Sequence, residues 1–176
     1  SDIALSGIAR TFQNVQLFGE MTALQNVQVG LHHTFESNFL DVALHTPRYR
    51  KEEKAATERG MSLLHFVGLA ELANEEARNL PYGKQRLLEI ARALALDPQL
   101  LLLDEPVAGV PAGERDELLN TVAALPSDVS IVLIEHDMDL VFEFADRITV
   151  LVNGAVLTEG KRYRIGEADV QAESRS

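Results

Sequence analysis

Residues 100–109 have the sequence LLLLDEPVAG, in which four leucines lead directly into Asp104 and Glu105. A short apolar run bounded by polar residues predicts a strand buried on both faces. Ligands of open α/β sheets gather at the carboxyl ends of the strands, where these acids lie. Adjacent side chains of an extended chain point in different directions, so we expect one carboxylate to reach a metal, directly or through water, and the other to orient a water. A strand that simply ends in a polar turn is the alternative, and these residues alone leave it open.

The helix before this strand is the clearest in the sequence. In KQRLLEIARALAL, residues 84–96, one apolar face repeats at helical spacing and consists of Leu87, Ile90, Ala91 and Leu94. Further along, the patterns predict helices at residues 112–125 and 137–145, a second buried strand at 129–134, and a hairpin at 147–160 that turns at Asn153-Gly154. The alternation of helix and strand predicts an α/β fold with a mainly parallel sheet.

Residues 14–83 have a different character, because their patterns are mostly helical. One helix is expected to begin after Thr22, which would serve as its N-cap, and another covers residues 51–67 and stops at Gly68. This part of the chain is therefore predicted to be a helical insert or subdomain.

The composition excludes several classes of function. The chain of 176 residues has a formal net charge of −11, which argues against a protein that binds the phosphate backbone of nucleic acids. It has no cysteine, so disulfides and thiolate metal sites are excluded. No apolar run approaches the ~20 residues that a membrane-spanning helix needs, and the first residues lack the pattern of a signal peptide. Any contact with a membrane is expected to go through a partner.

Two further positions carry possible binding chemistry. Gln13 ends a short predicted strand before a loop, where its amide would suit a metal or a water; the alternative is an ordinary surface glutamine. Gly83 precedes the strong helix, so exposed backbone N–H groups and the positive end of the helix dipole would form an anion site, and Lys84 adds charge. An ordinary helix start is the alternative there.

His136 follows the second predicted strand, in the sequence IVLIEHD. Parallel strands of one sheet place their carboxyl ends side by side, so His136 is expected to come near Glu105 and to donate a hydrogen bond to a developing phosphoryl charge. A histidine that caps the following helix is the alternative reading of this residue.

The order of these segments resembles the nucleotide-binding subunit of ATP-binding-cassette (ABC) transporters. The matching stretches run from about Ile8 to Gly160 and are TFQN, NLPYGKQRLLEIARALALDP, LLLLDEP and IVLIEHD. The resemblance implies an incomplete P-loop NTPase core with a mainly parallel sheet plus a helical subdomain, and ATP and Mg²⁺ as cofactors. It divides the chain into residues 1–13, which lead to the Q-loop, a helical subdomain at 14–83, an α/β core at 84–160 and a tail at 161–176.

The resemblance also implies a role for each acid and for His136. Asp104 matches the magnesium-associated acid of the Walker B segment, and Gln13 matches the Q-loop glutamine that shares the metal shell. Glu105 takes the place of the catalytic glutamate that polarises the attacking water. His136 matches the switch histidine that contacts the γ-phosphate.

The signature motif is implied at LPYGKQ, with Gly83 as its second glycine. Tyr82, Gly83 and Lys84 would then serve the nucleotide held by a second ABC subunit. Pro81 replaces the usual serine, Tyr82 the first glycine and Lys84 the glutamine. Similar substitutions occur in the subgroup described next, so they are not expected to inactivate the site.

A narrower resemblance is to the ATPase subunits of branched-chain amino acid importers, carried by GIARTFQNVQLFGEMTALQNVQVG and NLPYGKQRLLEIARAL. It implies transmembrane permease subunits as partners, an indirect link to a periplasmic or extracellular binding protein, no nucleic acid, and a cytoplasmic location on the inner face of the membrane. Cassettes for lipopolysaccharide export and for urea or amide uptake are related alternatives.

The phosphate-binding pattern G-x-x-x-x-G-K-[ST] does not occur in these residues. In the family it precedes the Q-loop, so the sequence is expected to be a fragment that has no ATP turnover by itself. A non-catalytic module that docks to membrane or cassette partners through residues 14–83 is the alternative. A soluble cassette of translation or DNA repair is disfavoured by the acidic charge.

Overall fold

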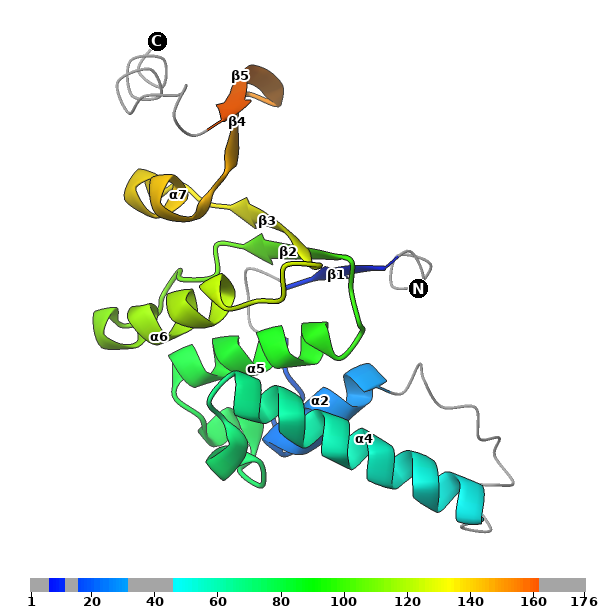
Figure 1. Cartoon of the computed structure of the whole chain (residues 1–176). Coiled ribbons are helices and arrows are strands. Elements are labelled where there is room, and N and C mark those ends of the chain that lie inside the picture. Colours follow the sequence, from blue (N-terminus) through cyan, green and yellow to red (C-terminus); the bar gives the residue numbers. More distant parts are fainter. Residues whose placement is uncertain (1–6, 12–15, 32–45, 162–176) are drawn as a thin grey trace. The chain divides into compact units, whose positions relative to one another are not determined.

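The computed structural model describes residues 7–11, 16–31 and 46–161 (Figure 1). The chain divides into two compact units, Ser1–Val132 and Leu133–Ser176, and each is described by itself. The helices and strands that begin in the first unit are β1 (Ile8–Arg10), α2 (Ala23–Leu31), α4 (Pro47–Phe66), the short 3₁₀ helices η2 (Ala70–Leu72) and η3 (Ala77–Asn79), α5 (Tyr82–Leu94), β2 (Leu100–Asp104), α6 (Ala112–Ala123) and β3 (Ser130–Ile134).

The sheet of the first unit has the order β1-β2-β3. β1 pairs with β2 in parallel, with Ile8 opposite Leu100 and Arg10 opposite Leu102. The backbone N–H of Thr11 continues this ladder and donates to the carbonyl of Leu102 at 2.9 Å. Parallel pairing of strands that alternate with helices confirms the predicted α/β class.

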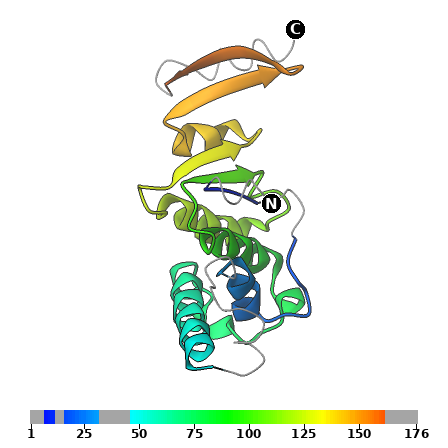
Figure 2. The same cartoon turned by 90° about the vertical axis from the view of Figure 1, so that its right-hand side faces the viewer.

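The burial predicted for the two strands is wrong. Leu101 and Leu103 of β2 are fully buried, but the opposite face of that strand is only half-buried. Ile131 and Val132 of β3 are 39% and 44% exposed. Figures 1 and 2 show α5 and α6 on the same face of β1 and β2, so only side chains that point toward these helices are enclosed. An apolar run indicates that its side chains favour burial. Whether they are buried depends on which helices or strands cover them.

α5 lies at the centre of the first unit. Its predicted apolar face is confirmed, because Leu87, Ile90, Ala91 and Leu94 are all buried. α5 packs against α2 and α4 on one side and against α6 and β1 on the other. Asp97, with a positive φ of 51°, and Pro98 follow its end as expected.

Local signals set the other helix ends. Thr22 caps α2 as predicted: its hydroxyl accepts from Gln25 N–H at 3.2 Å, and the Gln25 amide oxygen accepts from Thr22 N–H at 2.9 Å. α4 begins earlier than the charged run indicated, at Pro47, with Thr46 as its cap. Gly68, with φ of 72°, follows its end as predicted.

The second unit contains α7 (Met138–Phe144) and an antiparallel hairpin of β4 (Arg147–Val152) and β5 (Ala155–Lys161). Asn153 and Gly154 connect the strands with φ of 50° and 79°. Two consecutive positive φ values are what a two-residue type I′ turn requires, so the predicted turn is confirmed. Within the described ranges, every helix is too short or too polar to cross a membrane.

Candidate functional site

Asp104 is the last residue of β2, and Glu105 begins the turn that follows. Glu105 has a positive φ of 45°, and its carbonyl accepts from Ala108 N–H at 3.0 Å. A left-handed backbone is uncommon for a residue with a side chain and costs on the order of 1–3 kcal/mol. The backbone therefore changes direction sharply between Asp104 and Glu105, the two acids for which the sequence predicted separate roles.

Asp104 pairs with Arg10 of the neighbouring strand. Arg10 Nη2 lies 2.9 Å from Asp104 Oδ2, and the two side chains are 51% and 19% exposed. Because Arg10 is half in solvent, the pair is of the kind that contributes at most ~1 kcal/mol. The Asp104 carboxylate is thus held in place by a partner that water and ions can replace.

The donor set at β2 fits one kind of magnesium site. Among residues 7–11, 16–31 and 46–161 no group of three or more His, Cys, Asp or Glu side chains is placed to hold a metal. Mg²⁺ in nucleotide sites uses one or two carboxylates and takes its other ligands from water and phosphates. A single carboxylate at the strand end fits that pattern. Gln13, the other predicted ligand, lies outside the described residues.

The start of α5 differs from the prediction. Gly83 is buried, and its N–H donates to Glu114 Oε2 at 2.8 Å, while Lys84 Nζ forms an ion pair with Glu117 Oε1. Both acids belong to α6. The expectation of exposed N–H groups at Gly83 is therefore wrong, because the positive end of the α5 dipole is satisfied by a carboxylate of this chain. A Cβ at position 83 would overlap the Glu114 side chain, so glycine is needed for this approach.

Glu114 also explains how Pro81 is tolerated. Pro81 is the N-cap of α5 and makes no side-chain hydrogen bond there. An N-cap serine normally accepts from the N–H of the second or third helical residue. Gly83 is the second helical residue, so the carboxylate of Glu114 performs this task from another helix.

Tyr82 opens α5 and is 37% exposed. The guanidinium of Arg86 lies over its ring, 5.3 Å from the centroid. The Tyr82 ring also lies 3.4 Å from where a Cβ on Gly109 would stand. Tyr82 thus packs against the loop that follows Glu105, and only part of its surface is open to a ligand.

A buried ion pair in α5 is the feature that sequence analysis missed. Arg86 Nη1 lies 3.0 Å from Glu89 Oε2, and both side chains are 3% exposed. Glu89 Oε1 accepts from the backbone N–H of Gln16 at 2.7 Å. The sequence does contain a signal for this pair, because two charged residues lie among the apolar residues Leu87, Leu88 and Ile90.

His136 belongs to the second unit. Its backbone N–H donates to Glu135 Oε2 at 3.3 Å, and the cap of α7 is Asp137, whose carboxylate accepts from Leu140 N–H at 3.4 Å. The alternative of His136 as a helix cap is therefore wrong. The approach of His136 to Glu105 stays a prediction.

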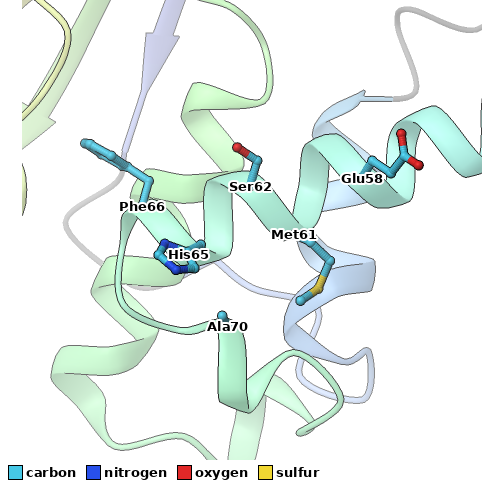
Figure 3. A pocket seen from close by; sticks show the side chains of 6 residues that line it. All are labelled: Glu58, Met61, Ser62, His65, Phe66 and Ala70. Atoms are coloured by element: carbon cyan, nitrogen blue, oxygen red, sulfur yellow. The ribbon is translucent and has the colours of Figure 1, made fainter.

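The first unit also contains a surface hollow. It is formed by the end of α4 and by η2, and it is lined by Glu58, Met61, Ser62, His65, Phe66 and Ala70 (Figure 3). None of the predicted site residues lines it.

Known proteins that are similar to this chain belong to the family that its motifs resemble. Residues 2–108 match the family model described as ABC transporter. Over 165 residues the chain is 46% identical to the high-affinity branched-chain amino acid transport ATP-binding protein BraF of Pseudomonas aeruginosa and 43% identical to LivG of Escherichia coli K12. Each alignment covers 93% of this chain and 65% of the relative, so the chain spans less than two thirds of these curated proteins.

A solved structure of an ATP-binding cassette has a similar fold. The crystal structure of the ADP conformation of MJ1267, an ATP-binding cassette of an ABC transporter, superposes with a TM-score of 0.73 at 32% sequence identity. The match covers 97% of this chain and 65% of that one.

Proposed function

The chain belongs to the ABC transporter family, and from that premise we propose that it is part of an ATP-hydrolysing subunit of an importer for branched-chain amino acids. The observation that carries the proposal is the pair Asp104–Glu105 at the carboxyl end of β2, in a chain 46% identical to BraF. The left-handed backbone at Glu105 supports it, since backbone strain of this kind clusters at active sites.

Hydrolysis of ATP depends on positioning and on charge stabilisation more than on covalent chemistry. Glu105 would orient the water that attacks the γ-phosphate. Asp104, together with Gln13, would hold Mg²⁺, which when bound neutralises charge on the phosphate oxygens. His136 would donate a hydrogen bond to the γ-phosphate as its charge develops.

The start of α5 would serve a nucleotide held by a second ATP-binding subunit. Tyr82, Gly83 and Lys84 are the residues assigned to that contact. In this structure Glu114 holds the Gly83 N–H and Glu117 pairs with Lys84. A phosphate that binds there would therefore have to displace two carboxylates of α6 from their partners.

The remaining assignments concern assembly. Subunits of this kind work with membrane components of a transporter, and residues 14–83 would form the helical subdomain that contacts the permease. The α/β core would cover residues 84–160, with the tail at 161–176. The binding protein would be linked only indirectly, and the location would be cytoplasmic, at the inner face of the membrane.

The test is ATP hydrolysis by a full-length subunit that contains this sequence and a phosphate-binding loop. Glu105→Gln keeps the size of the side chain but removes the negative charge that polarises water, so turnover should fall by about 10²–10³. Glu76→Gln is a control, because Glu76 is a half-exposed partner of Arg78 outside the site. Phosphate release at the wild-type rate by Glu105→Gln would refute the assignment.

A further inference from the structure

Arg10 and Asp104 lie on the face of the sheet that α5 and α6 leave uncovered. β1 and β2 pair in parallel with Arg10 opposite Leu102, and Asp104 follows Leu102 by two residues. Side chains two residues apart on a strand point to the same face, so these three share one face. The opposite face carries Leu101 and Leu103, which are fully buried and point toward the helices (Figures 1 and 2). The predicted metal ligand Asp104 therefore lies on the open side of β2.

The Asp104 side chain is mostly enclosed although its face of the sheet is open. It is 19% exposed, and the residues that precede it on this face are the half-buried Leu100 and Leu102. A carboxylate with so little surrounding water needs a charged or hydrogen-bonding partner, because desolvation disfavours an unpaired charge. Among the residues that the structure describes, Arg10 is the cation that pairs with it, with Nη2 at 2.9 Å from Oδ2.

Arg10 reaches solvent from the same position. Its side chain is 51% exposed, so the guanidinium has only a short way to move before water surrounds it. Exposed ion pairs between flexible side chains contribute little to stability, because hydration and side-chain entropy offset the attraction. The guanidinium can therefore leave Asp104 at a small cost in free energy.

A metal at Asp104 would compete with this guanidinium. A carboxylate that binds Mg²⁺ does so through an oxygen in direct contact with the ion. A guanidinium that stayed on the same carboxylate would then stand close to a divalent cation, and like charges repel more strongly where water is partly excluded. Release of Arg10 into solvent removes this repulsion, since the metal then balances the charge of Asp104.

We propose that Arg10 is a stand-in cation for the magnesium ion at Asp104: it holds the carboxylate before the metal binds and is displaced into solvent when Mg²⁺ arrives with the nucleotide. This inference rests on the proposed function and deepens it, because it names a residue that sets the affinity for the metal. Arg10 touches no reacting atom and acts through Asp104, so it is a positioning residue.

The alternative role of Arg10 has the opposite sign. An arginine that stayed in place and oriented the carboxylate as a metal ligand would strengthen metal binding, as partners of metal ligands commonly do. Displacement and orientation can therefore be separated by the direction in which metal affinity changes when Arg10 is replaced.

The test uses a full-length subunit that contains this sequence and a phosphate-binding loop, and it measures ADP binding instead of turnover. Calorimetry gives the Kd for ADP with Mg²⁺ and again with EDTA, and the ratio of the two values is the gain in affinity from the metal. Arg10→Met should raise this gain about threefold to fivefold, a size that matches the small energy of an exposed ion pair. The matched control is Arg78→Met, since Arg78 is 57% exposed and pairs with Glu76 outside β1 and β2. It should keep the wild-type gain.

Two further variants make the test independent of one substitution. Arg10→Gln is neutral but polar, suits a half-exposed position, and should give the same rise even if Arg10→Met does not fold. In an Asp104→Asn background the carboxylate for which the two cations compete is absent, so Arg10→Gln should not change the gain there.

The outcomes separate the three roles of Arg10. If the neutral variants lower Tm but keep the wild-type gain, Arg10 has a structural role only, and if they reduce the gain, Arg10 orients the ligand. Either result overturns the inference while ATP hydrolysis by the wild type leaves the proposed function standing. Absence of ATP turnover in the wild type would instead overturn the proposed function and this inference with it.

Discussion

The end of β2 and the start of α5 both carry residues predicted to contact a nucleotide, but the bonds that these residues form within the chain differ. At β2, Asp104 is held by a half-exposed arginine and Glu105 sits in a left-handed turn. At α5, Gly83 and Lys84 are already bonded to two acids of α6. At β2 the partner of Asp104 is half in solvent, whereas at α5 the N–H of the buried Gly83 is already bonded to Glu114. A ligand that binds Asp104 would therefore displace a weaker partner than a ligand that binds the Gly83 N–H.

The largest expected effect concerns the strained turn. Glu105→Gly should abolish turnover as Glu105→Gln does, a fall of about 10²–10³. Glycine accepts a positive φ without strain, so the same variant should raise the free energy of unfolding by about 1 kcal/mol. Hydrolysis assays and urea denaturation of the full-length subunit measure the two effects. A glycine variant less stable than Glu105→Gln would show that the turn is not strained.

The next effect tests the start of α5, where Glu114 occupies the space beside Gly83. Gly83→Ala introduces a methyl group where Glu114 already lies, so we expect a loss of about 1–3 kcal/mol from overpacking. Adding Glu114→Ala to this variant removes the obstructing side chain and should recover part of the loss. Urea denaturation of the two single variants and the double variant forms a cycle. Purely additive losses would mean that residues 83 and 114 do not compete for space.

A smaller effect is expected from the cap itself. Glu114→Gln keeps one oxygen for the Gly83 N–H but loses the charge that faces the helix dipole, so stability should fall by about 0.5–1 kcal/mol. Asp116→Asn, in the same helix but without a hydrogen bond or ion pair to the described residues of α5, is the charge-matched control. Equal losses in both variants would assign the effect to net charge rather than to capping.

The smallest effect is expected at Arg10. Arg10→Met keeps much of the side chain but removes the partner of Asp104, and at most ~1 kcal/mol of stability should be lost because the pair is half-exposed. The loss should shrink further in high salt, which screens exposed charges. A loss of several kcal/mol that is insensitive to salt would show that Asp104 depends on Arg10 as a buried group would.

Sequence reasoning succeeded where a signal is local. The apolar face of α5, the Thr22 cap and the Asn153-Gly154 turn each depend on residues within a few positions of one another, and the structure confirms them. It failed where the decisive partner is distant. Glu114 reaches Gly83 across 31 residues, and Gln16 meets Glu89 across 73. No periodic pattern predicts which carboxylate will arrive at a helix end, nor which face of β2 the helices will leave uncovered.

The origin of the α5 cap has a consequence for how the chain folds. A helix capped by its own preceding residue can begin to form locally, whereas the first turn of α5 obtains its acceptor only after α6 has docked. That hydrogen bond should therefore form after the rate-limiting step of folding. Removing it through Glu114→Ala should speed unfolding and leave the folding rate nearly unchanged, which corresponds to a φ-value near zero in a chevron analysis.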